Sequence, residues 1–365
     1  MSKGKVLVAM SGGIDSAVSA ALLIEEGWDA AGVFMRHGVP PSPTAKPGKQ
    51  GCCSLEDAWD ARRVADKLGM PFYVLNFERE FEKIVTYFVD EYDRGATPNP
   101  CIRCNRDLKF GRLFDYADSI GARQVATGHY ARAGERDGRV TLRRGVDDRK
   151  DQSYVLFPLK QAQMSRCLFP VGGLTKPQVR ELARKMDLRI AEKPESQEIC
   201  FVPDNDHRNL LREKLGDRAR PGELVTPAGE VVGTHPGHQF FTIGQRKGLG
   251  VALGRPAYVV AIDPNLNRVV IGDDDDLRSR HVDVEDVNWI VAPPSEPLRS
   301  TVKIRYNGPG ADGVVEPLGS DSARVLFDEP QRAVTPGQAA VFYAGDEVLG
   351  GGWIRRPSSV GRTSP

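Results

Sequence analysis

A glycine-rich turn and three cysteines are the parts of this sequence best suited to chemistry. The turn, Ser11-Gly12-Gly13-Ile14-Asp15-Ser16, follows the apolar run 5–10 and precedes a helix-like pattern. Two glycines leave no Cβ atoms in the way, so backbone N–H groups can converge on an anion. Ser11 and Ser16 add hydroxyl donors, and Asp15 suits a metal-linked or capping role. The pattern predicts a nucleotide site.

The turn differs from a Walker P-loop because no lysine follows its glycines. Without that lysine, the loop suits a β,γ-pyrophosphate that leaves after attack at the α-phosphorus. The motif Ser-Gly-Gly-x-Asp-Ser resembles that of the PP-loop ATP pyrophosphatases. That resemblance implies adenylation of a substrate and release of pyrophosphate. The alternative is an ordinary strand–turn–helix corner.

The thiols come as a pair and a distant single residue. Cys101 and Cys104 form a C-x-x-C at a proline-bounded turn that opens a helix expected to begin near Asn105, and Cys200 follows after a long gap. A helix N-terminus and nearby arginines stabilise a thiolate, so we expect low thiol pKa values. The C-x-x-C pair has three other interpretations: a structural zinc site, a redox-active dithiol or two incidental thiols. A structural zinc site needs four ligands, and only three cysteines are evident. Cys167 is expected in the core.

Composition limits the class of protein. The 365 residues are enough for two or three domains, and 50 Lys and Arg against 49 Asp and Glu leave a net charge of +1, so an RNA site must be a local basic face. No run of about 18 apolar residues occurs, so we expect a cytoplasmic protein without membrane contact. Six cysteines are too few for a disulfide scaffold. Cys52 and Cys53, just after the Pro/Gly/Ser-rich stretch 36–51, are interpreted as spare thiols.

The expected fold is α/β. The first 200 residues alternate strand and helix patterns, which predicts a parallel sheet with helices on both faces. Turn signals then separate short strands, and from about 279 the pattern suggests a small β-barrel. The expected domains are an N-terminal PP-loop ATP-binding and catalytic domain, a small β-rich central domain, a C-terminal β-barrel and a disordered tail: 1–204, 205–278, 279–356 and 357–365.

Further motifs occur in order along nearly the whole chain. Together with the loop, they resemble those of the bacterial tRNA-specific 2-thiouridylases (MnmA type). They are Thr97-Pro98-Asn99-Pro100 with Cys104-Asn105, Ala126-Thr127-Gly128-His129-Tyr130, Lys150-Asp151-Gln152-Ser153-Tyr154, Phe169-Pro170-Val171-Gly172, Ile199-Cys200-Phe201, Thr242 to Gly250 and Ala333 to Gln338.

The resemblance implies a reaction and a set of binding residues. ATP, with Mg²⁺, would adenylate the C2 oxygen of the wobble uridine in tRNAs for Lys, Glu and Gln, and sulfur would displace AMP. The implied ATP contacts are Ala9, Met10, Ser11, Gly12, Gly13, Ile14, Asp15, Ser16, Met35 and Gly128, with Asp15 needed for catalysis. The implied tRNA contacts are Asn99, Pro100 and Cys101 at a flipped base, and His129, Lys150, Asp151, Gln152, Arg305, Tyr306 and Gln338 elsewhere. The resemblance also implies that the central domain, 205–278, binds tRNA.

The resemblance implies two routes for the sulfur. In one, Cys200 carries a persulfide delivered by a cysteine desulfurase or sulfur-relay protein, and Cys104 attacks to release sulfur or closes a disulfide with Cys200. In the other, Cys101, Cys104 and Cys200 hold a [4Fe–4S] cluster by three irons, and the fourth iron binds sulfide. Some family members carry Asp where this chain has Cys101. The two routes give the same product.

Two other classes of protein remain as alternatives. A PP-loop ligase with an amine nucleophile would share the loop but would not need the three cysteines. A non-catalytic RNA- or nucleotide-binding protein would rely on the β-rich C-terminal part. A non-catalytic binding protein would not convert ATP to AMP in a tRNA-dependent way. That activity therefore separates it from the thiouridylase and from the ligase. The sulfur donor and the oligomeric state do not follow from the sequence.

Overall fold

A computed structural model describes most of the chain, in two compact units. The described residues are 2–38, 55–188, 190–193, 199–202, 206–251 and 254–356. The first unit comprises residues 1–84, 100–206 and 346–348, and the second comprises 85–99, 207–345 and 349–365. Cys52, Cys53, nearly all of the stretch 36–51 and the expected tail 357–365 lie outside the described residues.

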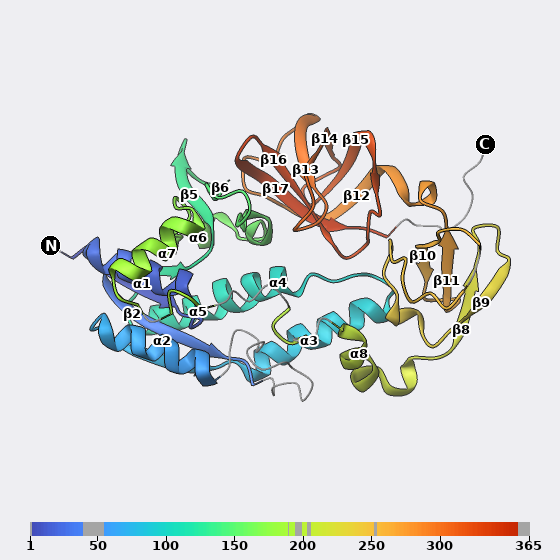
Figure 1. Cartoon of the computed structure of the whole chain (residues 1–365). Helices are drawn as coiled ribbons and strands as arrows, with labels where there is room; N and C mark the ends of the chain where they lie inside the picture. The colour runs from blue at the N-terminus through green and yellow to red at the C-terminus, as the bar shows by residue number, and fades with distance from the viewer. Residues whose placement is uncertain are drawn as a thin grey trace. The chain divides into compact units, whose positions relative to one another are not determined.

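A five-stranded parallel sheet forms the centre of the first unit (Figure 1). Its strand order is β3-β2-β1-β4-β7. The predicted parallel sheet is confirmed, although its edge strand β7 was not expected from the sequence. The strands are β1 (Lys5–Ala9), β2 (Asp29–Arg36), β3 (Phe72–Asn76), β4 (Gln124–Thr127) and β7 (Cys167–Leu168).

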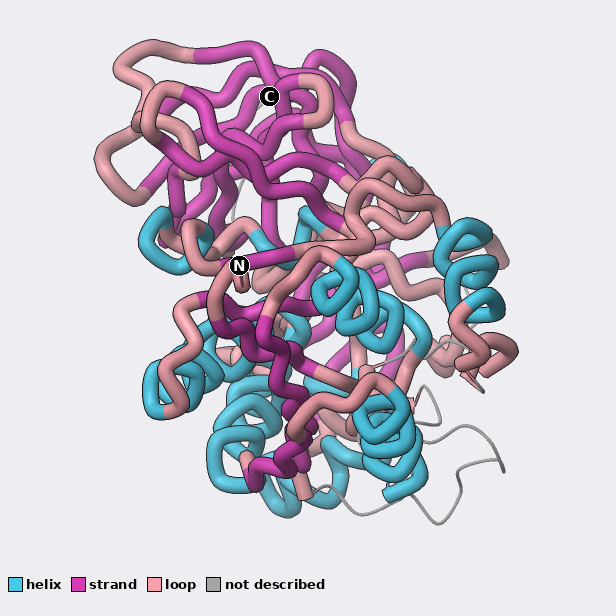
Figure 2. The backbone as a smooth tube through the Cα atoms, turned by 90° about the vertical axis from the view of Figure 1, so that its left-hand side faces the viewer, coloured by secondary structure: helices cyan, strands magenta, loops and turns pink. Residues whose placement is uncertain are grey.

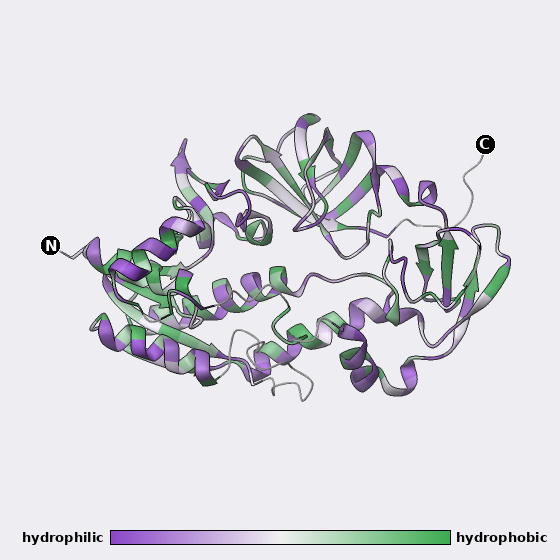
Figure 3. Ribbon diagram, viewed as in Figure 1, coloured by the Kyte–Doolittle hydropathy of each residue, from purple (hydrophilic) through white to green (hydrophobic). Residues whose placement is uncertain are grey.

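Helices lie on either side of this sheet (Figure 2). Val6 and Val8 of β1 share one buried cluster with α1, α2 and α7, while α5 packs against β4. Hydrophobic strands between amphipathic helices (Figure 3) are the pattern expected for a sheet buried on both faces. The helices of this part of the chain are α1 (Ile14–Glu25), α2 (Leu55–Lys67), α3 (Glu78–Asp93, divided between the units after Ile84), α4 (Pro100–Arg103), α5 (Leu113–Ser119), α6 (Gln161–Met164), α7 (Lys176–Lys185) and the 3₁₀ turn η2 (Ser153–Leu156).

The helix that carries the cysteine pair begins earlier than the sequence predicted. It starts at Pro100 as α4 and continues as a π-helix, η1 (Cys104–Arg112), so the expected start near Asn105 is wrong. Proline is favoured at the first position of a helix, where its missing N–H has no helical partner to lose. The interpretation of Pro100 as part of an extended turn missed this preference.

An antiparallel hairpin, β5 (Ala131–Arg136) and β6 (Arg139–Arg144), follows β4 directly. The sequence analysis did not predict it. Asp137 and Gly138 at its turn both have positive φ, of 53° and 71°. Asp-Gly between two strands is the usual sequence of such a two-residue turn, so this dipeptide was the available signal.

The second unit is mostly β. A four-stranded sheet has the order β10-β11-β8-β9, and six further strands in the order β12-β15-β14-β13-β16-β17 close through pairing of β12 with β17. The predicted C-terminal barrel is therefore confirmed. The elements are α8 (His207–Leu215), β8 (Gly222–Val225), β9 (Val231–His235), β10 (Tyr258–Asp263), β11 (Arg268–Gly272), β12 (Arg278–Trp289), β13 (Leu298–Lys303), β14 (Ala311–Pro317), β15 (Ser322–Arg332), β16 (Ala339–Ala344) and β17 (Glu347–Ile354).

Candidate active site

The predicted phosphate loop lies at the carboxyl edge of the parallel sheet. Residues 10–13 connect the end of β1 to the start of α1. Ala9 is paired with Val33 of β2 and with Thr127 of β4. Met35 and Gly128, each one or two residues beyond these partners, therefore lie at the same edge. Open α/β sheets bind ligands at this edge, so the fold brings the predicted ATP contacts together where a ligand is expected.

Two glycines of the site allow a backbone approach that no other residue permits. Gly12 has φ of 73°, and a Cβ there would lie 2.3 Å from the carbonyl oxygen of Asp57 in α2. A Cβ on Gly128 would lie 2.7 Å from the backbone nitrogen of Ser16. The loop is therefore packed between α2 on one side and the segment after β4 on the other.

The serines of the loop fix its own backbone. The Ser16 hydroxyl donates to the Gly13 carbonyl at 3.0 Å and accepts the Ser11 N–H at 3.2 Å. Gly13, the residue before α1, has no side chain to cap the helix. The first-turn N–H groups of α1 thus lack a side-chain cap at Gly13, as suits the binding of an anion.

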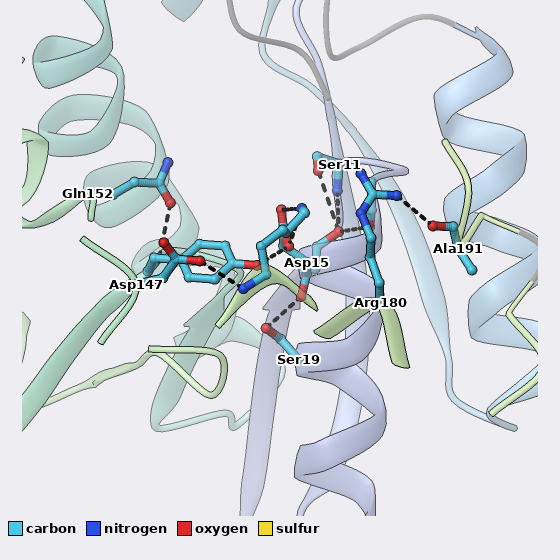
Figure 4. A network of polar contacts seen from close by, with 11 residues as sticks. Ser11, Asp15, Ser19, Asp147, Gln152, Arg180 and Ala191 are labelled. Carbon is cyan, nitrogen blue, oxygen red and sulfur yellow. Dashed lines mark hydrogen bonds and ion pairs between the residues drawn. The ribbon is translucent and has the colours of Figure 1, made fainter. Parts of the chain in front are cut away.

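Asp15 is bound to two residues that are distant in sequence (Figure 4). The Lys176 ammonium lies 2.7 and 2.8 Å from its two carboxylate oxygens, and the Tyr130 hydroxyl donates to one of them at 2.6 Å. The Tyr130 N–H also donates to the Gln152 side-chain oxygen, and the Tyr130 carbonyl accepts the Gln152 N–H. Asp15 is thus the centre of a polar network that reaches the predicted tRNA-contact segment 150–152.

A second lysine fixes the other side of the loop. The Lys193 ammonium donates to the Gly12 carbonyl at 3.1 Å and to Asp57 and Asp60 at 2.6 Å each. Burial by itself would lower the pKa of Lys193, but the hydrogen bonds with the two carboxylates outweigh it and raise that pKa. Burial by itself would raise the pKa of Asp60, but the interactions with Lys193 and Arg63 outweigh it and lower that pKa. Lys193 therefore stays charged and joins the loop to α2.

The thiols lie in the same unit as the loop. Cys101 is exposed in the first turn of α4, and Cys104 and Cys200 are half-buried. None of these three, nor Cys167, is in a disulfide. Burial raises the pKa of the Cys167 thiol, and its predicted place in the core is confirmed.

The π-helix places Cys104 at a change of backbone geometry. Within η1, Phe110 departs from helical angles, at φ −115° and ψ 17°, and its carbonyl accepts the Gln163 amide at 2.6 Å. The buried Asn105 amide donates to the Val155 carbonyl at 3.3 Å, while its oxygen has no partner among the described residues. π-Helical segments are rare and frequent at functional sites.

The thiols do not form a metal site as placed. In the part of the chain that the structure describes, no group of three or more His, Cys, Asp or Glu side chains is arranged to hold a metal ion. Cys101, Cys104 and Cys200 therefore do not fit a cluster in this arrangement, and the chemistry below is written for the thiols themselves.

The predicted tRNA contacts of the first unit differ in exposure. Lys150 and Gln152 are partly exposed, whereas the Asp151 carboxylate is buried and accepts hydrogen bonds from the Gly145 and Ser153 backbone and from the Ser153 hydroxyl. His129 is also buried, and its Nδ1 lies 2.7 Å from the Thr127 hydroxyl. Asp151 and His129 are therefore less accessible to an RNA than Lys150 and Gln152 as the structure places them.

Burial has a consequence for the charge of His129. Burial lowers the pKa of this side chain well below its usual range, and the positive charge of Lys109 acts in the same direction. The ring lies beside the rings of Phe110 and Phe169, at centroid distances of 5.9 and 6.2 Å. His129 is therefore neutral near pH 7.

The other predicted tRNA contacts belong to the second unit, where one segment holds them. The Gln338 amide donates to the carbonyls of Thr97 and Pro98, just before Asn99. Arg305 is exposed, and its guanidinium donates to the carbonyls of Arg332 and Ala333. The segment 332–338 thus connects Asn99 and Gln338 with Arg305 and the neighbouring Tyr306.

Comparison with known families covers nearly the whole chain. Residues 4–204 match the tRNA methyl transferase HUP domain, residues 208–273 the tRNA methyl transferase PRC-barrel domain, and residues 279–354 the aminomethyltransferase beta-barrel domain. The tRNA-specific 2-thiouridylase MnmA of Carboxydothermus hydrogenoformans is 53% identical over 357 residues, which are 96% of this chain and 98% of that protein. This chain belongs to the tRNA-specific 2-thiouridylase family.

A second relative has a similar identity and coverage, whereas a solved structure is only distantly similar. The MnmA of Geobacter metallireducens is 51% identical over 355 residues, 96% of each chain. Among solved structures, the U34-tRNA thiolase NcsA from Methanococcus maripaludis with its [4Fe-4S] cluster matches 60% of this chain and 68% of its own at 17% identity and a TM-score of 0.33. A likeness this low carries no argument about the cofactor. No described helix is both long and apolar enough to cross a membrane.

The structure adds residues that sequence reasoning missed. Tyr130 appeared there only as part of a motif, and Lys176 and Lys193 received no role. Thr175 and Pro177 on either side of Lys176 are typical of a helix start, and this was a weak local signal that the sequence analysis did not use. The approach of Lys193 to Gly12, 181 residues away, left no local pattern to read.

Proposed function

We propose that this enzyme uses ATP to place sulfur on C2 of the wobble uridine in tRNAs for Lys, Glu and Gln. Membership of the family supports thiolation of a tRNA uridine. The HUP domain match supports ATP as the activating substrate. ATP enters as its Mg²⁺ complex, and a reaction on tRNA places the enzyme in the cytoplasm.

The observation that carries the proposal is the presence of two chemistries in one compact unit. The first unit contains a glycine loop built for an anion and the three thiols Cys101, Cys104 and Cys200. An amine-transferring ligase has use for the first but none for the second. A thiolating enzyme needs both, because a carbonyl oxygen must be activated before sulfur can replace it.

The loop serves the first step. The uridine C2 oxygen attacks the α-phosphorus, the bond from that phosphorus to the bridging oxygen breaks, and pyrophosphate leaves with the electron pair. The base loses its N3 proton to water in the same step and regains one from water when 2-thiouridine is released. The N–H groups around Gly12, Gly13 and Gly128 hold the phosphates while charge moves onto the leaving group.

The thiols serve the second step. Cys200 carries a persulfide, and its terminal sulfur attacks C2 and displaces AMP. The Cys104 thiolate then attacks the Cys200 sulfur, which forms a disulfide between the two residues and releases 2-thiouridine. A dithiol reductant reopens the disulfide, and a cysteine desulfurase or sulfur-relay protein reloads Cys200.

Several polar residues are proposed to hold the tRNA. Asn99, Pro100 and Cys101 contact the flipped base, since chemistry on C2 requires the base to leave its stack. Lys150 and Gln152 contact the RNA directly, with Asp151 and His129 fixing the backbone and packing under them. Arg305, Tyr306 and Gln338 act in the second unit.

The proposal is tested with unmodified tRNA. Purified enzyme, ATP and a persulfide donor should give AMP and pyrophosphate only when tRNA is present, and 2-thiouridine should appear in the digested tRNA. Turnover without tRNA, or transfer of an amine in place of sulfur, would overturn the proposal.

The same thiolation assay, combined with metal analysis, decides between the two sulfur routes. Iron and acid-labile sulfide are measured on protein prepared without oxygen. Full activity from iron-free protein supports the thiol route. About four irons per chain, with activity lost on chelation, would replace it with the cluster route through Cys101, Cys104 and Cys200.

A further inference from the structure

Lys176 has an unusual place for a lysine. It is the first residue of α7, its side chain is only 8% exposed, and its ammonium lies against the carboxylate of Asp15 in the first turn of α1 (Figure 4). The two residues are 161 positions apart in sequence. The fold therefore buries a long charged side chain in order to bring its end to the phosphate loop.

The stability of α7 does not explain why a lysine occupies its first position. The N-terminal end of a helix carries partial positive charge, so a lysine there is unfavourable. The chain offsets the conflict, because the Asp147 carboxylate accepts the Lys176 N–H at 2.9 Å and Gln178 accepts the Thr175 N–H at 2.7 Å. A residue that opposes local stability and is held by compensating contacts indicates a functional role.

The other lysine at the loop has a different environment. Lys193 is shared between the carboxylates of Asp57 and Asp60, and it also holds the Gly12 carbonyl. The Lys176 ammonium instead lies against the Asp15 carboxylate, which also accepts a hydrogen bond from Tyr130. The Asp15 side chain is 30% exposed, so this pair is accessible to solvent through its carboxylate.

We propose that Lys176 supplies the cation that binds the β- and γ-phosphates of ATP, in the role that a loop lysine has in Walker proteins. Asp15 holds the ammonium beside the loop, and the phosphates take it over when ATP binds. The lysine absent from the loop sequence thus comes from the start of α7. The inference rests on the proposed use of ATP at this loop.

Binding measurements without tRNA test the inference. Calorimetric titration of ATP, pyrophosphate and AMP compares the unchanged protein with Lys176→Met. The variant should bind ATP and pyrophosphate roughly 10- to 100-fold more weakly, the loss expected for a charge-assisted contact, and AMP within about twofold of the original affinity. Lys176→Arg should recover part of the loss. An equal loss for AMP and ATP, or unchanged pyrophosphate binding, would overturn it.

Lys185→Met is the matched control. Lys185 ends the same helix, is 67% exposed and pairs with Glu181 at 2.8 Å. The same substitution there should leave the affinity for ATP, pyrophosphate and AMP unchanged.

A double variant covers the case in which an unpaired Asp15 disturbs folding. Asp15→Asn with Lys176→Met removes both charges and keeps an acceptor for Tyr130. The folded double variant should bind AMP normally and lose pyrophosphate, and pyrophosphate binding retained by it would reject the inference. Thiolation by the unchanged protein is measured separately, so a failure of the proposed function is distinguishable from a failure of Lys176.

Discussion

The phosphate loop and the thiol-bearing helix differ in the regularity of their backbones. The loop is fixed by distant contacts on each side, with Lys193 and α2 at Gly12, Lys176 and Tyr130 at Asp15, and Gly128 against the first turn of α1. The helix of Cys104 instead changes from α to π geometry at the thiol itself.

The difference follows from what each region must do. Displacement at phosphorus depends on donors that are already in position, and a misplacement of 1 Å is costly. A thiol that receives sulfur, attacks and is then reduced must meet several partners. A backbone with irregular hydrogen bonding suits such a residue better than a regular helix does.

Two substitutions should separate the regions completely. Asp15→Ala should abolish pyrophosphate release, because the carboxylate that organises Lys176 and Tyr130 is lost. Cys200→Ser should leave tRNA binding and adenylation intact but stop thiolation, since no persulfide can form. Both are measured by pyrophosphate release and by 2-thiouridine in digested tRNA.

Cys167→Ala is the control for the thiol change, because that buried thiol takes no part in the proposed steps and its loss should spare thiolation. Thiolation at a normal rate in Cys200→Ser would remove the role assigned to Cys200.

Gly12→Ala should show how tightly the loop is packed. Positive φ alone costs about 1–2 kcal/mol for a residue with a Cβ, and the added methyl group would collide with the Asp57 backbone. We expect loss of ATP binding by calorimetry and a fall in the free energy of unfolding that exceeds the cost of positive φ.

Gly27→Ala is the matched control for this prediction. Gly27 has φ of 88°, and a Cβ there would meet nothing within 4 Å. It should cost stability only. Equal effects of the two substitutions on ATP affinity would mean that the approach of α2 is unimportant.

His129 should make stability depend on pH. Its pKa in the folded protein is lowered, so between that value and about 6.5 the unfolded chain binds the extra proton. The stability that comes from keeping His129 neutral is fully present above about pH 6.5. It is lost as the pH falls below that value, at about 1.4 kcal/mol of unfolding free energy per pH unit. Urea unfolding from pH 7.5 to 5 should show a weaker pH dependence in His129→Asn. An identical slope in both proteins would contradict a neutral His129.

Gln163→Ala should affect the thiol region modestly. It frees the Phe110 carbonyl and removes the bond to the Lys160 N–H at the start of α6, for a loss of about 1–2 kcal/mol in unfolding free energy. The rate at which Cys104 is alkylated should change as well.

Gln178→Ala loses the equivalent bond at the start of α7 without touching η1. It should be destabilised by a smaller amount and leave the alkylation of Cys104 unaltered. Unchanged Cys104 reactivity in Gln163→Ala would show that the geometry of η1 does not depend on this contact.

The sequence by itself determined the elements and the chemistry of the loop. Period-2 and period-3.6 patterns and glycine turns are local, so the strands at residues 5–9 and 29–36, the helix after Gly13 and the β-rich second half followed from them. The thiols were visible because cysteines are few and the motifs are short. The start of the cysteine helix was misplaced because helix boundaries depend on the preferences of single residues such as Pro100.

Only the tertiary structure decided which charges meet at the loop. Lys176 and Lys193 reach it from helices and turns 161 and 181 residues away, and no periodicity records a contact between such distant side chains. Likewise, only the structure showed that Asp151 and His129, two of the predicted tRNA contacts, are buried. Sequence patterns carry the information of neighbours along the chain, whereas the electrostatics of a site depend on neighbours in space.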